Sequence, residues 1–267
     1  MEESKLITII NNNPHYIKNI NNPTDEMKLL ALKKNGLVLE YIQNPTDEMK
    51  EIAIESNVNA IKYIDNPSEE IMIKAVSNGW TMLNYIKNPT EKVIKLAIEK
   101  SGWAIQYVEN PSEELQLLAV SKNYDSLKFI KRPYESVQEK AITISYDALK
   151  YIKEPSFRAE VLAVKDNEAA ITLIDELDKD KMLEFLKVNI LVFKYIRKHI
   201  SKEKLEEVLK RVLSKENVEE KYVRDFLNCK TIDKDNGTIS IDKTMFIYKY
   251  GSKKAKKIAV DEKLKIV

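Results

Sequence analysis

The sequence of 267 residues contains little of the chemistry on which most catalytic and metal-binding sites depend. Its single cysteine, Cys229, excludes an internal disulfide and a zinc site built from several thiolates. Its two histidines, His15 and His199, stand far apart, and we find neither a nucleophile with a neighbouring base nor a glycine-rich phosphate loop. We therefore expect a protein that is not an enzyme and that uses no metal ion or cofactor.

Long apolar segments are also missing. No stretch approaches 18 consecutive apolar residues, and the first ten residues, MEESKLITII, lack the basic region and the cleavage site of a signal peptide. Apolar residues make up 43% of the chain, which is enough to bury a core and excludes disorder as its main state. The basic and acidic side chains nearly balance, at 44 and 42. These features predict a folded, soluble, cytoplasmic protein.

The prolines reveal an internal repeat. Seven of the eight are spaced by 22 residues: Pro23, Pro45, Pro67, Pro89, Pro111, Pro133 and Pro155. With each proline taken as position 0, position 8 is always alanine: Ala31, Ala53, Ala75, Ala97, Ala119, Ala141 and Ala163. The register extends back to Met1 and forward to Leu177. We therefore predict nine repeats over residues 1–198, with each small alanine at a close helix contact.

Each repeat is expected to form two short helices. In the second proline repeat, Asn44 can cap the first helix with Pro45 at its first position, although Thr46 is a competing cap. A glycine such as Gly36 suits a left-handed turn after this helix, and a second helix of about seven residues follows. Position 18 is mostly tyrosine and position 19 mostly isoleucine, which predicts the packing interface between repeats. Because helices this short are unstable alone, they must stack as an α-solenoid.

The pattern changes after residue 198, so residues 199–267 are predicted to form a separate C-terminal region. Amphipathic segments at residues 201–215 and 217–227 are expected to cap the open end of the solenoid. Residues 231–241 resemble a hairpin with a turn at 233–237, and residues 245–250 and 258–260 suggest further strands. The predicted fold is an all-α solenoid with a helical cap and a small β appendage.

One repeat carries a resemblance to a known family. Residues 110–120 read NPSEELQLLAV, and Lys122 and Asn123 follow. This unit resembles a short helical-hairpin repeat of unknown function that is common in proteins of bacteriophages and low-GC bacteria, and the match covers about three quarters of the chain. The resemblance implies a phage or mobile-element origin, a place in the cytoplasm of a bacterial host, and inhibition of a host defence system in the manner of an anti-CRISPR protein. The 39 lysines against five arginines are compatible with AT-rich codons.

Departures from the repeat suggest where a partner binds. Positions 13 and 14 favour glycine or asparagine, but four repeats carry a large ring there, which predicts a stripe along one edge: Trp80, Trp103, Tyr124 and Tyr146. The alternative is that these rings fold back over the turn and cover the core. Arg132 and Tyr134 also depart from the repeat. They flank Pro133 at the two positions where asparagine and a hydroxyl residue are usual. The six residues are the candidate site for a protein partner, such as a host defence ribonucleoprotein or its protein component.

Charge is uneven along the chain. Residues 21–176 hold 19 basic and 25 acidic groups, whereas residues 241–267 hold eight basic and three acidic groups. Five lysines of this tail lie close to Phe246, Tyr248 and Tyr250: Lys249, Lys253, Lys254, Lys256 and Lys257. Basic and aromatic groups together suit RNA, single-stranded DNA or an acidic protein, whereas the simpler interpretation is a solvated hairpin. A protein-binding scaffold is the favoured function, and a nucleic-acid-binding repeat protein is the alternative.

Overall fold

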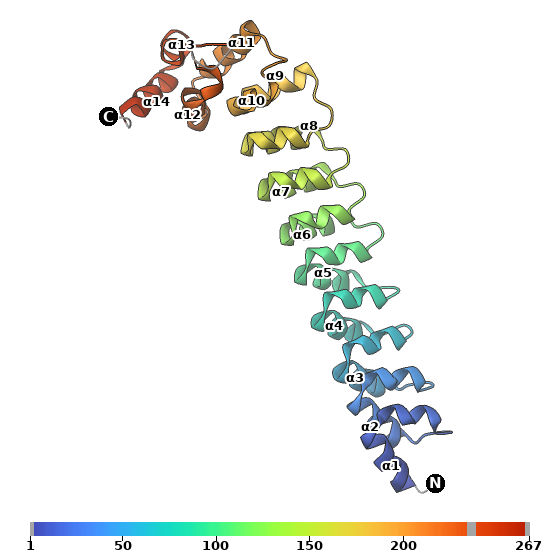
Figure 1. Ribbon diagram of the computed structural model, residues 1–267. Helices are drawn as coiled ribbons and strands as arrows, with labels where there is room; N and C mark the ends of the chain where they lie inside the picture. The colour runs from blue at the N-terminus through green and yellow to red at the C-terminus, as the bar shows by residue number, and fades with distance from the viewer. Residues whose placement is uncertain (1–2, 234–238, 265–267) are drawn as a thin grey trace. The chain divides into compact units, whose positions relative to one another are not determined.

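The computed structural model describes residues 3–233 and 239–264, which belong to two compact units, Met1–Pro133 and Tyr134–Val267. Figure 1 shows that both units consist of helices, and no strand occurs in the described residues. Each unit has its own set of packed helices.

The N-terminal unit is a tandem array in which an α-helix of ten residues alternates with a 3-10 helix of six residues (Figure 1). The α-helices are α1 (Glu3–Asn12), α2 (Asp25–Lys34), α3 (Asp47–Ser56), α4 (Glu69–Asn78), α5 (Glu91–Lys100) and α6 (Glu113–Lys122). The 3-10 helices are η1 (Pro14–Asn19), η2 (Gly36–Tyr41), η3 (Val58–Tyr63), η4 (Trp80–Tyr85), η5 (Gly102–Tyr107) and η6 (Tyr124–Phe129). Each helix packs against its counterpart in the next repeat. The predicted two-helix repeat is confirmed here.

In the proline repeats, the residue after proline is the N-cap of the α-helix, and the helix begins at the next residue. The hydroxyl of Thr46 accepts a hydrogen bond of 3.3 Å from the backbone N–H of Met49, which satisfies one of the free donors of the first turn. The same cap occurs at Thr24, Ser68, Thr90, Ser112 and Ser156. Asn44 has φ of 47° and lies in the left-handed region that asparagine tolerates, so a cap at Asn44 was the wrong alternative. Pro45 accordingly precedes the cap rather than occupying the first helical position.

The second helix of each repeat is a 3-10 helix rather than an α-helix. The side chain of Asn35 begins η2 by accepting a hydrogen bond of 3.0 Å from the N–H of Leu37. Three residues per turn bring positions 13, 16 and 19 onto one face. Leu39 and Ile42, at positions 16 and 19, are buried accordingly. The prediction that position 19 packs inside is therefore confirmed.

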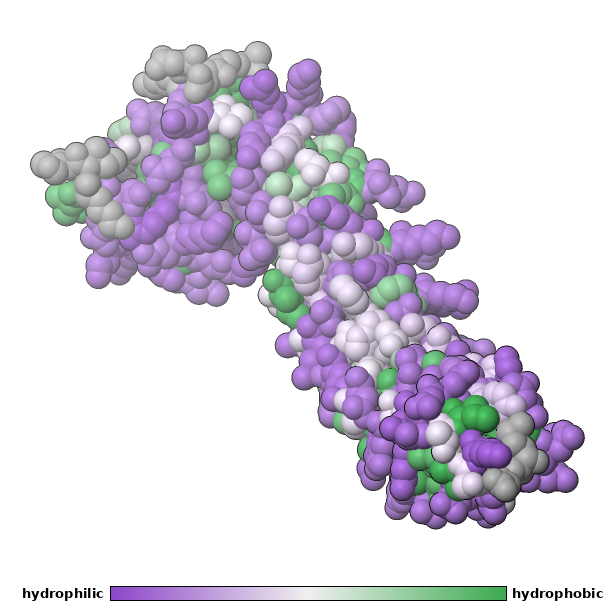
Figure 2. Space-filling model, turned by 60° about the horizontal axis from the view of Figure 1, so that its bottom comes forward, coloured by the Kyte–Doolittle hydropathy of each residue, from purple (hydrophilic) through white to green (hydrophobic). Residues whose placement is uncertain are grey.

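The core of the array is a column of small and branched apolar side chains. The alanines of position 8 are fully buried in all seven repeats, as predicted: Ala31, Ala53, Ala75, Ala97, Ala119, Ala141 and Ala163. Each alanine carbonyl accepts a hydrogen bond from the residue that caps the next 3-10 helix, as Ala53 does from Asn57 at 2.8 Å. Hydrophilic residues dominate the face shown in Figure 2, and hydrophobic residues form only small patches on it.

Two glycines let neighbouring repeats approach closely. A Cβ atom on Gly36 would lie 2.0 Å from the carbonyl oxygen of Ala53, and one on Gly102 would lie 2.2 Å from that of Ala119. Neither glycine has a left-handed backbone, so the expected left-handed turn at Gly36 was wrong. The N–H of Gly36 donates instead to the hydroxyl of Ser56 in the next repeat, at 3.1 Å. Glycine is required at both positions because a Cβ atom would clash with the neighbouring repeat, and not because of the backbone torsion angles.

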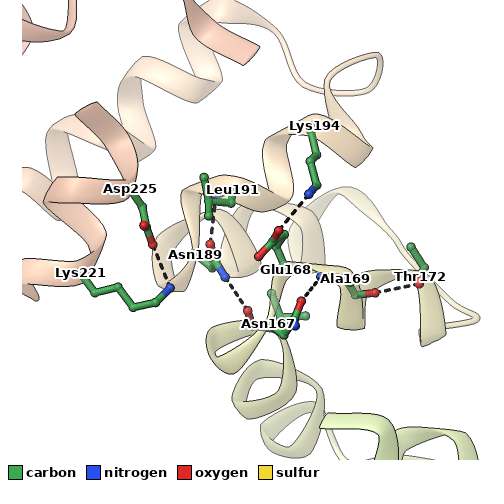
Figure 3. Close-up of polar contacts among 10 residues, drawn as sticks. Asn167, Glu168, Ala169, Thr172, Asn189, Leu191, Lys194, Lys221 and Asp225 are labelled. Atoms are coloured by element: carbon green, nitrogen blue, oxygen red, sulfur yellow. Dashed lines mark hydrogen bonds and ion pairs between the residues drawn. The ribbon is translucent and has the colours of Figure 1, made fainter. Parts of the chain in front are cut away.

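The C-terminal unit starts with three further repeats. Its helices are α7 (Glu135–Ile144), η7 (Tyr146–Tyr151), α8 (Phe157–Asp166), η8 (Glu168–Leu173), α9 (Lys179–Val188), η9 (Ile190–Val192), α10 (Phe193–Ile196), α11 (Lys202–Leu213), α12 (Glu220–Asn228), η10 (Lys230–Ile232), α13 (Lys243–Tyr250) and α14 (Lys253–Leu264). Buried Asn189 joins two repeats, because its Nδ2 donates to the carbonyl of Val164 at 2.9 Å and its Oδ1 accepts from Leu191 (Figure 3). Helix α11 packs against α9, and α12 packs against η9 and α14. The division at residue 198 stays a prediction.

The predicted β appendage is wrong, because the segments expected as strands form α13 and α14. Asp242 caps α13 by accepting a hydrogen bond of 3.0 Å from the N–H of Met245. In α14, Ala255, Ile258 and Ala259 are buried with the spacing of a helix, which outweighs the β propensity of single residues. Among the residues that the structure describes there, one backbone hydrogen bond, from the N–H of Ile241 to the carbonyl of Ile232, joins the two ends of the expected hairpin. Most of its turn lies outside the described residues.

Candidate protein-binding surface

The aromatic residues of position 18 form a set of exposed or half-buried rings in the N-terminal unit. We call this set the aromatic ladder, and it consists of Tyr41, Tyr63, Tyr85, Tyr107 and Phe129, each at the last residue of a 3-10 helix. Tyr85 is 44% exposed and Tyr41 is also exposed, whereas the other three are half-buried. Position 18 is thus more exposed than position 19, and its part in the packing interface between repeats stays a prediction. It lies at the edge of the buried face, where one side of the ring packs and the other meets solvent.

Trp80 adjoins the ladder from the start of η4. Its ring centroid lies 6.1 Å from that of Tyr107 in the next repeat, with an angle of 32° between the planes. The indole is half-buried. Trp80 thus agrees in part with each of the two interpretations made from the sequence. The indole packs beside the ring of Tyr107, and the rest of it is exposed at the surface.

Trp103 is the more exposed tryptophan, at 38%, and its position is fixed by the next repeat. Its Nε1 donates a hydrogen bond of 2.8 Å to Oδ1 of Asp125. The ammonium of Lys128 lies 4.7 Å from the centroid of the Trp103 ring and forms a 3.1 Å ion pair with Asp125. Lys128 also lies 5.1 Å from the centroid of Phe129. The indole is therefore held in one orientation while much of its surface stays open to a partner.

The remaining candidates divide between the two units. Tyr124 begins η6 and is half-buried, and Arg132 is exposed and makes no hydrogen bond or ion pair with the described residues. Tyr134 and Tyr146 belong to the C-terminal unit, where Tyr134 is 51% exposed at the start of α7 and Tyr146 is half-buried at the start of η7. The structure thus brings Trp80 and Trp103 to the ladder, and a single stripe of four rings stays a prediction.

Charges of both signs surround the ladder. Residues 1–133 hold 16 basic and 18 acidic side chains. A hydrogen bond to Tyr63 raises the pKa of Lys62, and the charge of Glu40 raises the pKa of Tyr41. Near neutral pH the lysine therefore stays charged and the Tyr41 hydroxyl stays protonated. The surface offers neutral rings and mixed charges rather than a continuous cationic track.

The five lysines of the tail lie on helices rather than on a hairpin. Lys249 is in α13, and Lys253, Lys254, Lys256 and Lys257 are in α14, and all five are exposed. The ammonium of Lys256 lies 5.8 Å from the ring centroid of Tyr248, which is 72% exposed. A hydrogen bond between Lys249 and Tyr250 raises the pKa of the lysine and lowers that of the tyrosine. Lysines and aromatic rings therefore lie near one another as predicted, but on helices α13 and α14 rather than on a hairpin.

Other chemistry is sparse among the described residues. No group of three or more histidine, cysteine or acidic side chains there is arranged to hold a metal ion. Cys229 is buried, and burial raises the pKa of its thiol. Among the helices of the described residues, none has both the length and the apolarity of a membrane-spanning segment.

Comparisons with family models, with curated proteins and with solved structures gave no match to this chain.

Sequence reasoning missed the residues that orient the rings. Asp125 and Lys128 fix Trp103, and neither residue was singled out. The sequence did contain a signal for this contact. Asp125 stands at the same repeat position as Trp103, exactly one repeat of 22 residues later. The exposure of position 18 had no such signal, because tyrosine is common both inside and at the surface of proteins.

Proposed function

We propose that this chain is a non-catalytic repeat scaffold that binds a protein partner through the aromatic ladder together with Trp80 and Trp103. The observation that carries the proposal is the state of Trp103, which is 38% exposed and yet held by a hydrogen bond and a cation–π contact. Tryptophan and tyrosine concentrate binding energy at protein interfaces. A ring already fixed in place loses little conformational entropy when a partner covers it.

The charge of the unit favours a protein over a nucleic acid at this surface. Nucleic-acid binding draws most of its affinity from cations that neutralise phosphates. The N-terminal unit has a small excess of acidic groups, and Asp125 already neutralises Lys128 beside the exposed indole. Exposed Arg132 adds a side-chain type that is frequent at protein interfaces.

A finer proposal follows from the resemblance of the repeat to those of phage and low-GC bacterial proteins. On that basis the partner belongs to a host defence ribonucleoprotein, and binding blocks its activity in the cytoplasm of the host. The resemblance is its only support. Loss of interference activity in a reconstituted defence complex on addition of this protein would be the expected result.

The proposal is tested by paired affinity captures from host lysate. The wild-type chain and the double variant Trp103→Ala/Tyr85→Ala serve as baits, and Tyr248→Ala in the C-terminal unit is the matched control. We expect a protein that is retained by wild type and control and lost from the double variant. Circular dichroism and melting temperature must match for all three baits. A capture pattern identical for all baits would contradict the proposal.

A second candidate function is binding of single-stranded nucleic acid by α13 and α14. The observation in its favour is the pairing of exposed lysines with rings, at Lys256 with Tyr248 and at Lys249 with Tyr250. Lys253 and Lys254 also stand in the first turn of α14, where the helix dipole disfavours positive charge. Phosphates and stacked bases would use both features.

This second candidate predicts binding that weakens steeply with salt, because each neutralised phosphate releases counterions. Fluorescence anisotropy with a labelled single strand would measure the slope. The fourfold variant Lys253→Gln/Lys254→Gln/Lys256→Gln/Lys257→Gln should abolish binding. Salt-insensitive binding that survives the four substitutions would eliminate this function.

A further inference from the structure

Four large apolar side chains are exposed on the last two helices of the C-terminal unit, α13 and α14. Each of the four is more than half exposed: Met245 and Tyr248 on α13, and Val260 and Leu264 on α14. The two helices pack against each other (Figure 1). A single exposed apolar residue is ordinary, but a group of four on two adjoining helices indicates an interaction surface.

These side chains lie along one stripe. Met245 stands three residues before Tyr248 and so shares its face of α13. The ammonium of Lys256 lies 5.8 Å from the centroid of the Tyr248 ring, which places this face of α13 beside α14. Val260 and Leu264 follow Lys256 by four and eight residues on the same side of α14. We call Met245, Tyr248, Val260 and Leu264 the apolar stripe.

Positive charge surrounds the apolar stripe. Helices α13 and α14 hold seven basic and two acidic side chains. Lys243 pairs with Asp233, and Glu262 pairs with Arg224. The other six lysines are exposed and form no ion pair with the described residues: Lys249, Lys253, Lys254, Lys256, Lys257 and Lys263. Among the described residues of these two helices only Asp261 is left to oppose them, so the face favours an anionic partner.

The aliphatic groups of the stripe decide among anionic partners. A nucleic-acid strand would use the lysines and the Tyr248 ring, but it leaves the side chains of Val260 and Leu264 without a matching surface. Lysine is depleted at protein interfaces, whereas six lysines surround this stripe. An anionic bilayer offers both a negatively charged surface and an apolar region just beneath it. Tyrosine and lysine suit this boundary, because each has an apolar body and a polar tip.

We propose that the outer face of α13 and α14 binds the surface of an anionic lipid bilayer. The lysines contact the phosphate headgroups, and each raises the affinity by about fivefold. The apolar stripe enters the boundary between the headgroups and the acyl chains. This contact is independent of the aromatic ladder, which belongs to the N-terminal unit. It uses the same lysines as the single-strand candidate above, and the experiment below separates the two.

The test is flotation of the full chain with lipid vesicles, alongside titration with a labelled single-stranded oligonucleotide. One set of vesicles contains phosphatidylcholine alone, and the other contains phosphatidylcholine and phosphatidylglycerol in a two-to-one ratio. Val260→Ser/Leu264→Ser removes apolar groups and keeps every charge, and the fold should be unaffected because both side chains are exposed. Ile144→Ser is the matched control, since Ile144 is an exposed isoleucine of α7 in the same unit.

Insertion of the stripe is measured separately by fluorescence. Tyr248→Trp in a Trp80→Phe/Trp103→Phe background places the only indole of the chain in the stripe. We expect its emission to shift to shorter wavelength with the phosphatidylglycerol vesicles and to be quenched by brominated acyl chains. Tyr195→Trp in the same background is the control, because Tyr195 is exposed on α10, and its emission should not change.

We expect binding to the phosphatidylglycerol vesicles and none to phosphatidylcholine alone. Val260→Ser/Leu264→Ser should weaken this binding by about tenfold or more, and Ile144→Ser should leave it unchanged. If the double variant fails to fold, the fluorescence measurement decides. The proposal is overturned if the anionic vesicles are not bound, if the double variant binds them like wild type, or if the introduced indole shows no shift. Binding of the oligonucleotide without binding of vesicles would overturn it in favour of a nucleic acid.

Discussion

The indole Nε1 of Trp103 donates a 2.8 Å hydrogen bond to Oδ1 of Asp125, 22 residues and one repeat further along the chain. The orientation of an exposed ring is thus set by the following repeat rather than by its own. Stacking of repeats therefore does more than bury a core in this protein, because it also positions the side chains on the surface.

Replacing Asp125 should loosen Trp103 with little loss of stability. Asp125→Ala removes the acceptor and the partner of Lys128, and because these groups are at least partly exposed we expect a loss below about 1 kcal/mol in the free energy of unfolding. Acrylamide quenching of Trp103 in a Trp80→Phe background should increase. Asp47→Ala is the control, since Asp47 pairs with Lys50 in the same way. Equal quenching before and after Asp125→Ala would contradict this account of the ring.

The glycine positions make a sharper structural prediction. Gly36→Ala and Gly102→Ala would each place a Cβ against a backbone carbonyl, so we expect each to destabilise by about 1–3 kcal/mol, the usual range for overpacking. Gly79→Ala is the matched control, because its Cβ would lie 3.9 Å from the nearest atom, the hydroxyl oxygen of Thr81. Thermal melts of the three variants test this directly. Similar melting temperatures for all three would show that the repeats do not approach as closely as described.

Helix α7 lacks the cap that the other proline repeats of the array possess. Its N-cap residue is Tyr134, whose side chain makes no capping hydrogen bond. The N–H of Val137 donates at present to the carbonyl oxygen of Tyr134, at 3.0 Å. Tyr134→Ser should give it the side-chain acceptor that the other caps provide and raise the free energy of unfolding by about 1 kcal/mol. Thr90→Ala, which removes the cap of α5, should lower it by a similar amount. If Tyr134→Ser lowered the melting temperature, the ring would contribute more to folding than a cap does.

The ion pair between Lys194 and Glu168 predicts a dependence on acid. The hydrogen bond that Lys194 donates to Glu168 is 2.9 Å long and lowers the pKa of Glu168 below its ordinary value (Figure 3). A lowered pKa in the folded state gives stability above the unfolded value, and this stability is lost as pH falls through the folded value. Glu168→Gln should therefore reduce the melting temperature at pH 7 and leave it nearly unchanged at pH 3. Glu216→Gln should alter neither, and an equal effect of Glu168→Gln at both pH values would disprove the coupling.

The regular features of this fold were predictable, and its surface was not. The 22-residue spacing of proline and the invariant alanine predicted the two-helix repeat, because both residues have few structural uses at a fixed spacing. The 3-10 form of the second helix was missed, since six residues fit either helix type. Ile247 and Ile258 lie in helices despite the apparent strand pattern of their segments, because their burial where α13 and α14 pack against α12 outweighs local propensity. Contacts such as that between Trp103 and Asp125 depend on the spacing of stacked repeats, which the sequence does not state.

The most direct test of the proposed function compares affinity with stability for the same substitution. Trp103→Ala and Tyr85→Ala should each weaken binding of the captured partner by about 2 kcal/mol, roughly thirtyfold, as measured by isothermal titration calorimetry. Their melting temperatures should stay close to that of wild type, because both rings are exposed. Tyr248→Ala should change neither quantity. Unchanged affinity in both ladder variants, or unfolding of both, would contradict the claim that the aromatic ladder is the binding surface.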